Sequence, residues 1–265
     1  MSVLLMTVWL TGCVQEEFES TPSPAGNGIR FTLTVPDVNL PSVSSRTMTG
    51  TGTAKKEDEI ETVDILVFDM SKTPAVFLEW VSATGVTQDL ADNSTVSFSA
   101  VLSPTTASTC IVVVANKELD NIVSGFTKGA TTKVEAMEKM LHTQTGKWLA
   151  DGSTTGGYTR IPMYGEKVIS KITPSMDPIT GINMKRMLAR IDIRNNSATS
   201  NFTVEEVYLA NYNTTGYIAP AWNTNGQVTD PVPDTPVLPA GSGKMTEEGD
   251  AILYSVNGNT PYDGE

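Results

Sequence analysis

The residue types that most often carry catalysis or metal binding are scattered in this chain of 265 residues. His142 is the single histidine and falls within a helical pattern, without a second imidazole or a thiolate for a zinc site or a Ser-His-Asp triad. We interpret it as a helix-surface histidine. Asp89, Asp92 and Asn93 could share a calcium ion, but they lack the glycine and terminal glutamate of an EF-hand loop, which favours a polar turn. The sequence therefore predicts no metal site and no cofactor.

Two other kinds of reactive site find equally little support. Gly50-Thr51-Gly52 begins like a nucleotide-binding loop, but Lys55 stands where the third glycine would be and no strong strand leads into it. A hydrolase would need carboxylates that converge in a pocket, and no pair can be assigned to acid-base work from spacing alone. We therefore expect a protein that is not an enzyme.

The surroundings of Cys13 predict a covalent modification. The apolar stretch 3–10 is too short to span a bilayer and is typical of the hydrophobic region of a secretion signal, although Met1-Ser2 provides no basic residue before it. Leu10-Thr11-Gly12-Cys13 resembles the bacterial lipobox, in which the cysteine sulfur is acylated and the cysteine becomes residue one. The alternative is an apolar N-terminus that packs on the domain, which the acidic and Pro/Ser/Gly-rich residues that follow make a poor entrance to a core. We expect a lipid anchor at Cys13.

Composition narrows the class of protein further. The net charge of −12 argues against general affinity for nucleic acid, because phosphate binding needs clusters of Lys and Arg. Only two cysteines are present, so lipidation of Cys13 leaves Cys110 without a partner, and we expect no internal disulfide. Beyond Cys13 the longest apolar run, 110–115, is far short of a membrane span. Plentiful Thr, Ser, Gly, Asn and Val favour a mostly β chain that is soluble apart from its anchor.

The first half of the chain has a tether, a first strand and a long loop. Residues 14–27 have the polarity and proline content of a solvated tether. In the first predicted strand, 29–35, Ile29, Phe31, Leu33 and Val35 alternate with polar residues, as in a strand with one wet face. A polar loop over 37–59 follows, and a loop of this length inside a compact domain is usually functional or disordered.

Further strands and one helix follow from periodicity. The segments 63–69 and 109–116 are apolar on both faces, as central strands are, and Cys110 is best explained as a small buried residue. A three- and four-residue spacing over 131–148 predicts an amphipathic helix of about three turns that begins at Thr131 or Thr132. We place a domain boundary near 178–181. The other segments with a strand pattern are 77–81, 95–102, 187–195, 202–211 and 251–256.

An ordered set of sequence phrases resembles the Bacteroidetes fimbrillin family, the FimA/Mfa-type subunits of type V pili. Each phrase alone is weak, but the set in this order is fairly specific. It comprises the lipobox 10–13, VDILVFD at 63–69, CIVVVANK at 110–117, IPMYGE at 161–166, MLARIDIRN at 187–195 and VEEVYLANYN at 204–213.

This resemblance implies a fold, a location and an assembly mechanism. It implies two transthyretin-like β-sandwich domains, residues 28–180 with one short helix and residues 181–265, the second short or incomplete, after a signal peptide at 1–13 and a tether at 14–27. It also implies export as a lipoprotein to the outer membrane surface, where Glu16 and Glu17 resemble an acidic export signal, and a role in adhesion. In the family an arginine-specific protease cuts the loop after the first strand, and a neighbouring subunit's strand fills the groove. Here the cut would fall between Arg46 and Thr47 and remove the strand that carries Ile29, Phe31, Leu33 and Val35.

Two interpretations remain beside a polymerising fimbrial subunit. Arg46 is simply a loop residue if no such cut occurs, and the chain is then an anchor subunit or another surface lipoprotein. That lipoprotein could bind glycans for an uptake system through exposed aromatic side chains, whose candidates are Trp80, Trp148, Trp222, Tyr158, Tyr164 and Tyr217. Because these aromatics are scattered along the chain, packing in a core or an interface is the favoured use.

Overall fold

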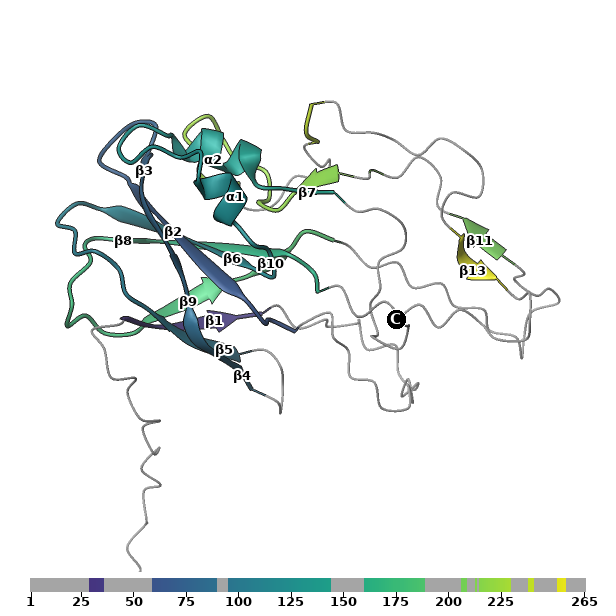
Figure 1. The fold of residues 1–265 in the computed structure, drawn as a ribbon, viewed down its shortest axis with the longest axis horizontal. Coiled ribbons are helices and arrows are strands. Elements are labelled where there is room, and N and C mark those ends of the chain that lie inside the picture. The colour runs from purple at the N-terminus through teal and green to yellow at the C-terminus, as the bar shows by residue number, and fades with distance from the viewer. Residues whose placement is uncertain are drawn as a thin grey trace, which may run out of the picture.

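The computed structural model describes residues 29–35, 59–89, 95–143, 160–188, 206–208, 213, 215–229, 238–240 and 252–255. Within these ranges the chain is mostly β, which confirms the predicted fold class. Its main part is a sandwich of two sheets with two short helices (Figure 1). The finer transthyretin-like topology stays a prediction.

The two sheets of the sandwich have four and five strands. The four-stranded sheet has the order β4 (Thr84–Gln88), β5 (Thr95–Ala100), β1 (Ile29–Thr34), β9 (Ile179–Asn183). The five-stranded sheet has the order β10 (Lys185–Arg186), β8 (Met163–Ile169), β6 (Thr109–Ala115), β2 (Val63–Asp69), β3 (Val76–Ser82). Both sheets are antiparallel except where β1 runs parallel to β9.

The remaining elements are short. Helices α1 (Asp120–Val123) and α2 (Lys133–Lys139) lie on the outer face of the five-stranded sheet (Figure 1). Two small antiparallel pairs join β7 (Leu141–Thr143) to β12 (Thr215–Tyr217) and β11 (Glu206–Tyr208) to β13 (Ile252–Ser255).

Hydrophobic cores on both faces of the five-stranded sheet explain its composition. Alternate residues of β2 and β6, such as Ile65 and Ile111, enter the core between the two sheets, whereas Leu66 and Val112 pack against the helical layer. A strand covered on both faces must be apolar at successive positions, and this is the pattern from which the sequence predicted central strands. We call the core between the five-stranded sheet and the helical layer the second core. Cys110 belongs to it and is fully buried, as expected.

The helix predicted over 131–148 is shorter in the structure. It begins after Thr132, whose side chain accepts a hydrogen bond from the Glu135 N–H, while the Glu135 carboxylate accepts one from the Thr132 N–H. This capping box fixes the start of α2. The helix ends at Lys139, because Leu141–Thr143 leave the helical path and pair with β12 as β7.

At two places the chain passes from one sheet to the other with a single residue between the two strands. Ala83 alone separates β3 from β4, and Met184 alone separates β9 from β10. Close approach at the second corner depends on Gly165 in β8, where an added Cβ would lie 2.7 Å from the Met184 sulfur and 2.8 Å from an Ile182 methyl carbon. The boundary predicted between 180 and 181 therefore falls inside β9, and residues 182–186 belong to the sandwich.

A buried group of polar side chains lies inside the second core. Lys133 is fully buried, and its ammonium contacts the Glu166 carboxylate at 2.6 Å. The Tyr164 hydroxyl donates to the same carboxylate oxygen at 2.6 Å, and the Val228 N–H donates to the other at 3.4 Å. Lys133 is the first residue of α2, and lysine side chains are usually exposed to solvent. It is buried instead because its charge is paired with Glu166, and an unpaired buried charge would be very costly.

The ionisation of two groups in this core should make folding sensitive to alkaline pH. Burial raises the pKa of the Cys110 thiol from its ordinary 9.0 to about 11, which the nearby Lys133 opposes only in part. Burial and the adjacent Glu166 raise the pKa of the Tyr164 phenol well above 10. Both groups hold their protons more tightly in the folded chain, so their contribution is complete below pH 9 and is lost as the pH rises.

We therefore predict that the free energy of unfolding falls by about 2 kcal/mol between pH 8.5 and 11. Denaturant titrations at several pH values measure it. Cys110→Ala should flatten the decline between pH 9 and 10, and Tyr164→Phe should flatten the part above pH 10. A decline with the same slope in both variants would contradict this assignment.

Candidate functional site

The candidate site is β1 together with the strands on either side of it. β1 pairs antiparallel with β5 over six consecutive residues, from Ile29 opposite Ala100 to Thr34 opposite Thr95. On its other side it pairs parallel with β9, where the register shifts between Phe31 and Leu33. β1 therefore occupies the middle of its sheet, and both of its backbone edges are hydrogen-bonded (Figure 1).

The side chains of β1 divide cleanly between core and solvent. Ile29, Phe31, Leu33 and the following Val35 point into the core and are at most 4% exposed. Arg30 and Thr34 are exposed on the opposite face, and Thr32 is half-buried there. The sequence alternation indicates this arrangement correctly, because successive side chains of a strand point to opposite faces.

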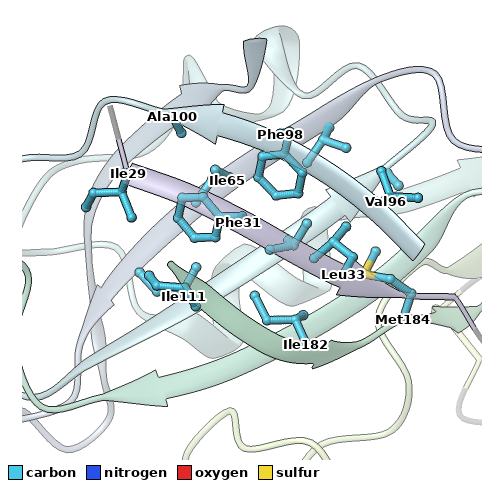
Figure 2. Packing of buried hydrophobic residues seen from close by; sticks show 14 of the residues in the cluster. Ile29, Phe31, Leu33, Ile65, Val96, Phe98, Ala100, Ile111, Ile182 and Met184 are labelled. Carbon is cyan, nitrogen blue, oxygen red and sulfur yellow. The ribbon is translucent and has the colours of Figure 1, made fainter. Parts of the chain in front are cut away.

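Figure 2 shows how the inward side chains of β1 meet both sheets. The Phe31 ring stacks on Phe98 of β5, with ring centroids 5.0 Å apart and planes 6° from parallel. Ile65 and Ile111 reach the same core from the opposite sheet. Near the end of β1, Leu33 lies beside Ile182 and Met184.

The burial of β1 is a large part of the stability of the sandwich. Full burial of one large aliphatic or aromatic side chain stabilises a fold by about 1.5–3 kcal/mol. Four such side chains together contribute about 6–12 kcal/mol, which is comparable with the whole stability of an ordinary domain. A sandwich that lost β1 would also expose the unpaired backbone edges of β5 and β9.

The chain that follows residues 36–58 is held firmly at its first described residues. Asn116, at the end of β6, has a positive φ of 58°, and its amide group donates to the Glu59 carbonyl at 2.8 Å and to the Ile161 carbonyl at 3.0 Å. Its side-chain oxygen accepts from the Glu61 N–H at 3.0 Å. One side chain thus ties together the starts of β2 and β8 and the end of β6.

Charge pairing reinforces the same place. Arg160 contacts the carboxylates of Glu59 at 3.2 Å and Glu61 at 2.7 Å, and Ile60 between them is buried in the core. We call the set Asn116, Arg160, Glu59 and Glu61 the β2 clamp. Because Val35 is buried as well, both ends of the 36–58 connection are fixed to the sandwich.

The structure describes only some of the residues that the sequence predicted for the site. Ile29, Phe31, Leu33 and Val35 come together along one face of β1. Cys13, Arg46 and Thr47 lie outside the described residues. Sequence reasoning missed the β2 clamp, although an Asn directly after an apolar strand is a recognisable signal, since Asn tolerates positive φ.

The other candidates are placed as follows. The prediction of a helix-surface histidine was wrong, because His142 lies in β7 opposite Gly216. Asp89 follows β4, whereas Asp92 and Asn93 lie outside the described residues, as do Gly50 to Gly52 and Lys55. In the part of the chain that the structure describes, no three His, Cys, Asp or Glu side chains gather as metal ligands, and no helix is long and apolar enough to cross a membrane.

The described aromatic side chains do not form a flat sugar-binding platform. Tyr164 is buried, and Trp80 packs against the second core. Tyr217 and Trp222 meet edge to face, with ring planes 80° apart. An open hollow of about 430 Å³ near β8 and β9 is lined without any aromatic residue, and Lys167 there donates to the Thr180 carbonyl. Trp148 and Tyr158 lie outside the described residues.

Comparison with known protein families gives a match. A family model described as major fimbrial subunit protein (FimA) matches residues 29–233, which begin at the first residue of β1. No curated protein matches the chain.

The β2 clamp generates a stability prediction. Asn116→Gly keeps a residue that tolerates positive φ but removes three side-chain hydrogen bonds, so the free energy of unfolding should fall by about 2–3 kcal/mol. Asn116→Ala should cost about 1 kcal/mol more because of backbone strain. Denaturant unfolding measures both values, and hydrogen exchange at the Glu61 amide should accelerate. A glycine variant as stable as the unchanged chain would show that the clamp is unimportant.

Proposed function

The chain belongs to the FimA major fimbrial subunit family, and from that premise we propose that it polymerises by exchange of β1 for a strand of another subunit. Family membership itself makes the protein a structural subunit of a cell-surface fimbria that assembles with other fimbrial subunits. The family is one of structural proteins and not of enzymes. The mechanism of assembly, the lipid anchor and the role in adhesion are the parts that we propose.

The observation that carries the proposal is the position of β1 in the fold. β1 lies in the middle of the four-stranded sheet, yet the chain connects it to the rest of the sandwich only through residues 36–58. A single cut in that connection makes β1 a separate strand held by non-covalent contacts alone. Arg46 lies in this connection, and we propose that an arginine-specific protease cuts between Arg46 and Thr47.

A groove filled by another strand has a lower free energy than a groove left empty after β1 is lost. An empty groove between β5 and β9 would expose the apolar surface that Ile29, Phe31, Leu33 and Val35 now cover. A strand from a second subunit satisfies both the backbone edges and this apolar surface, which is the general mode of β-strand addition. Exchange thus converts one subunit's internal strand into an intersubunit contact of similar strength.

The β2 clamp supports the same mechanism from the other side of the cut. The segment that follows the proposed cut would become the new N-terminal region of the subunit. Glu59 and Glu61 are tied to Asn116 and Arg160, none of which lies on β1. The start of β2 therefore has contacts that do not depend on β1.

We propose that the chain reaches the outer membrane surface as a lipoprotein. Residues 1–13 act as the signal peptide and lipobox, Cys13 carries the acyl chains, and residues 14–27 form the tether that contains Glu16 and Glu17. Each buried methylene contributes about 0.8 kcal/mol, so two or three chains anchor the protein stably. Exposure at the surface would allow the fimbria to serve adhesion.

We also propose a second domain toward the C-terminus, with a revised start. β9 and β10 belong to the first sandwich, and Ile218 and Ala219 are buried in its second core. We therefore propose that the N-terminal unit extends to include residues 215–229, beyond the boundary predicted at 180. The β11–β13 pair is a candidate part of the second domain.

The maturation step is tested by proteolysis of the full chain. We expect an arginine-specific protease to yield one main product that begins at Thr47. Arg30 and Arg186 lie in hydrogen-bonded strands, which resist cutting, and Arg160 is paired with two carboxylates. Arg46→Gln should stay intact and fail to form polymers. Arg30→Gln is the matched control, since Arg30 is exposed on β1 and its loss leaves the proposed cut unchanged. Intact mass and N-terminal sequencing identify the products, and cleavage scattered through the sandwich would refute this step.

The anchor is tested by metabolic labelling with a fatty acid in a Bacteroidetes host. We expect the unchanged chain to carry label and to sediment with membranes, and Cys13→Ser to lose both properties. Cys110→Ala is the control, because it removes the other cysteine, which is buried. Label that persists in Cys13→Ser would rule out this site of acylation.

A further inference from the structure

The pair of Lys133 and Glu166 brings an amine against a carboxyl group inside the second core. The Lys133 side chain is fully buried, the Glu166 side chain is 21% exposed, and the Lys133 Nζ lies 2.6 Å from the Glu166 Oε2. Arg160, which pairs with Glu59 and Glu61, offers no such combination, because its side chain is 26% exposed and its guanidinium stays charged. The buried pair therefore holds a nucleophile and an acyl group in contact, with little access for bulk water.

The elements around this pair hold both side chains in place. Lys133 begins α2, and its backbone N–H donates to the Ala75 carbonyl at 2.8 Å. Glu166 lies in β8, which pairs with β6 along its whole length. The turn at 223–226 closes over the lysine, since a Cβ added to Gly226 would lie 3.1 Å from the Lys133 Cβ. Two groups fixed in contact can react as if one were present at an effective concentration of about 10⁵ M or more.

Two hydrogen-bond donors polarise the carboxyl group of Glu166. The Tyr164 hydroxyl donates at 2.6 Å to Oε2, the same oxygen that contacts Lys133. The Val228 N–H donates to Oε1 at 3.4 Å, and a contact of this kind shortens as negative charge develops on the acceptor. Burial and the adjacent Glu166 hold the pKa of the Tyr164 phenol well above 10, so its hydroxyl keeps its proton at neutral pH. One carboxyl oxygen thus has an acid beside it, and the other has a donor that stabilises an oxyanion.

We propose that Lys133 and Glu166 form an intramolecular amide, which joins the first residue of α2 covalently to β8. One proton passes from the ammonium to the carboxylate, which gives a neutral amine and a neutral acid. The Lys133 Nζ then bonds to the Glu166 Cδ, and the Cδ–Oε2 bond breaks. Oε2 leaves as water, and the two protons that it gains equal the two that Nζ loses. The Tyr164 hydroxyl donates a proton to the departing Oε2 and regains one afterwards.

Amide formation removes two charges from the interior of the protein. A buried ion pair has lost much of the hydration of both ions, whereas an amide is neutral and needs only ordinary hydrogen bonds. The Val228 N–H remains available to the amide oxygen, because Oε1 stays in the product. The released water has a way out, since the Glu166 side chain is partly exposed. The balance that favours hydrolysis in dilute solution is therefore shifted toward the amide at this place.

The amide closes the chain between positions 133 and 166 into a covalent loop. A force applied outside this loop does not extend the residues inside it, because the amide carries the load across. A closed loop also restricts the unfolded chain more than the folded one, which favours the folded state. This inference concerns the five-stranded sheet and its covering layer, and it does not depend on the strand exchange proposed above.

The test is mass spectrometry of a tryptic digest of the full folded chain after incubation at neutral pH. Trypsin cuts after lysine and arginine but not after a lysine whose side chain is acylated. We therefore expect the peptide 129–139 joined to the peptide 161–167, with a mass one water molecule below their sum. A chain without the amide gives 129–133, 134–139 and 161–167 as separate peptides. Loss of water elsewhere in the chain gives no joined peptide.

Three variants probe the roles of the individual groups. Lys133→Arg keeps a cation beside Glu166 but removes the amine, so it should give no joined peptide. Lys139→Arg is the matched control, because it changes an exposed lysine of the same helix, and it should leave the yield of joined peptide unchanged. Tyr164→Phe should slow the reaction by about tenfold or more, measured from the fraction of joined peptide at successive times after synthesis.

The outcomes separate the amide from the role of the tyrosine. Recovery of the separate peptides alone from the folded parent chain would overturn the proposal. A joined peptide that forms at the parent rate in Tyr164→Phe would overturn the role of Tyr164 and leave the amide standing. If Lys133→Arg does not fold, the digest of the parent chain decides the question, because the joined peptide itself identifies both residues.

Discussion

The pairing of β1 on both of its edges is the constraint on which the four-stranded sheet depends. β5 and β9 do not touch each other as neighbours, and each completes its hydrogen bonding through β1. The core between the sheets depends on the same strand, because its inward side chains fill the space beneath Ile65 and Ile111. Backbone satisfaction and apolar burial thus fail together when β1 is absent, so the vacant state is strongly disfavoured. A subunit with this arrangement is complete only when some strand fills that place.

The five-stranded sheet differs from the four-stranded one because it is covered on both faces. It is covered on one face by the four-stranded sheet and on the other by α1, α2 and residues 215–229, so its central strands stay buried whatever fills the groove. The Lys133–Glu166 pair joins α2 to β8, and the Val228 N–H bonds to the same carboxylate. Charges in this position contribute to a specific arrangement of the covering layer more than to net stability. The covering layer of the five-stranded sheet is therefore held by contacts that do not involve β1.

Periodicity in the sequence was enough to predict most strands but not their neighbours. β1 was recognisable from alternation, and β2 and β6 from continuous apolar runs, because burial on one face or two leaves a direct signature. β9 was missed, since Pro178 and Gly181 marked a turn and its pairing with β1 joins residues about 150 positions apart in the chain. The helix was predicted too long, because Leu141 fits both the helical spacing and the pairing of β7 with β12. The inward residues of the site followed from alternation, whereas the Phe98 stack and the β2 clamp depend on tertiary contacts that no local pattern records.

In a filament joined by the proposed strand exchange, the position of β1 between two strands has a mechanical consequence. A strand bonded along both edges, and pulled along its own axis, is loaded in shear: the backbone bonds to β5 and to β9 must yield together rather than one after another from an end. Its inward side chains would also have to slide past Phe98 and Ile182 before they could leave the core. Detachment under load is governed by the rate of that concerted step and not by the equilibrium affinity. A joint of this kind resists a steady pull along the fibre far better than a sideways peel at one end of the strand.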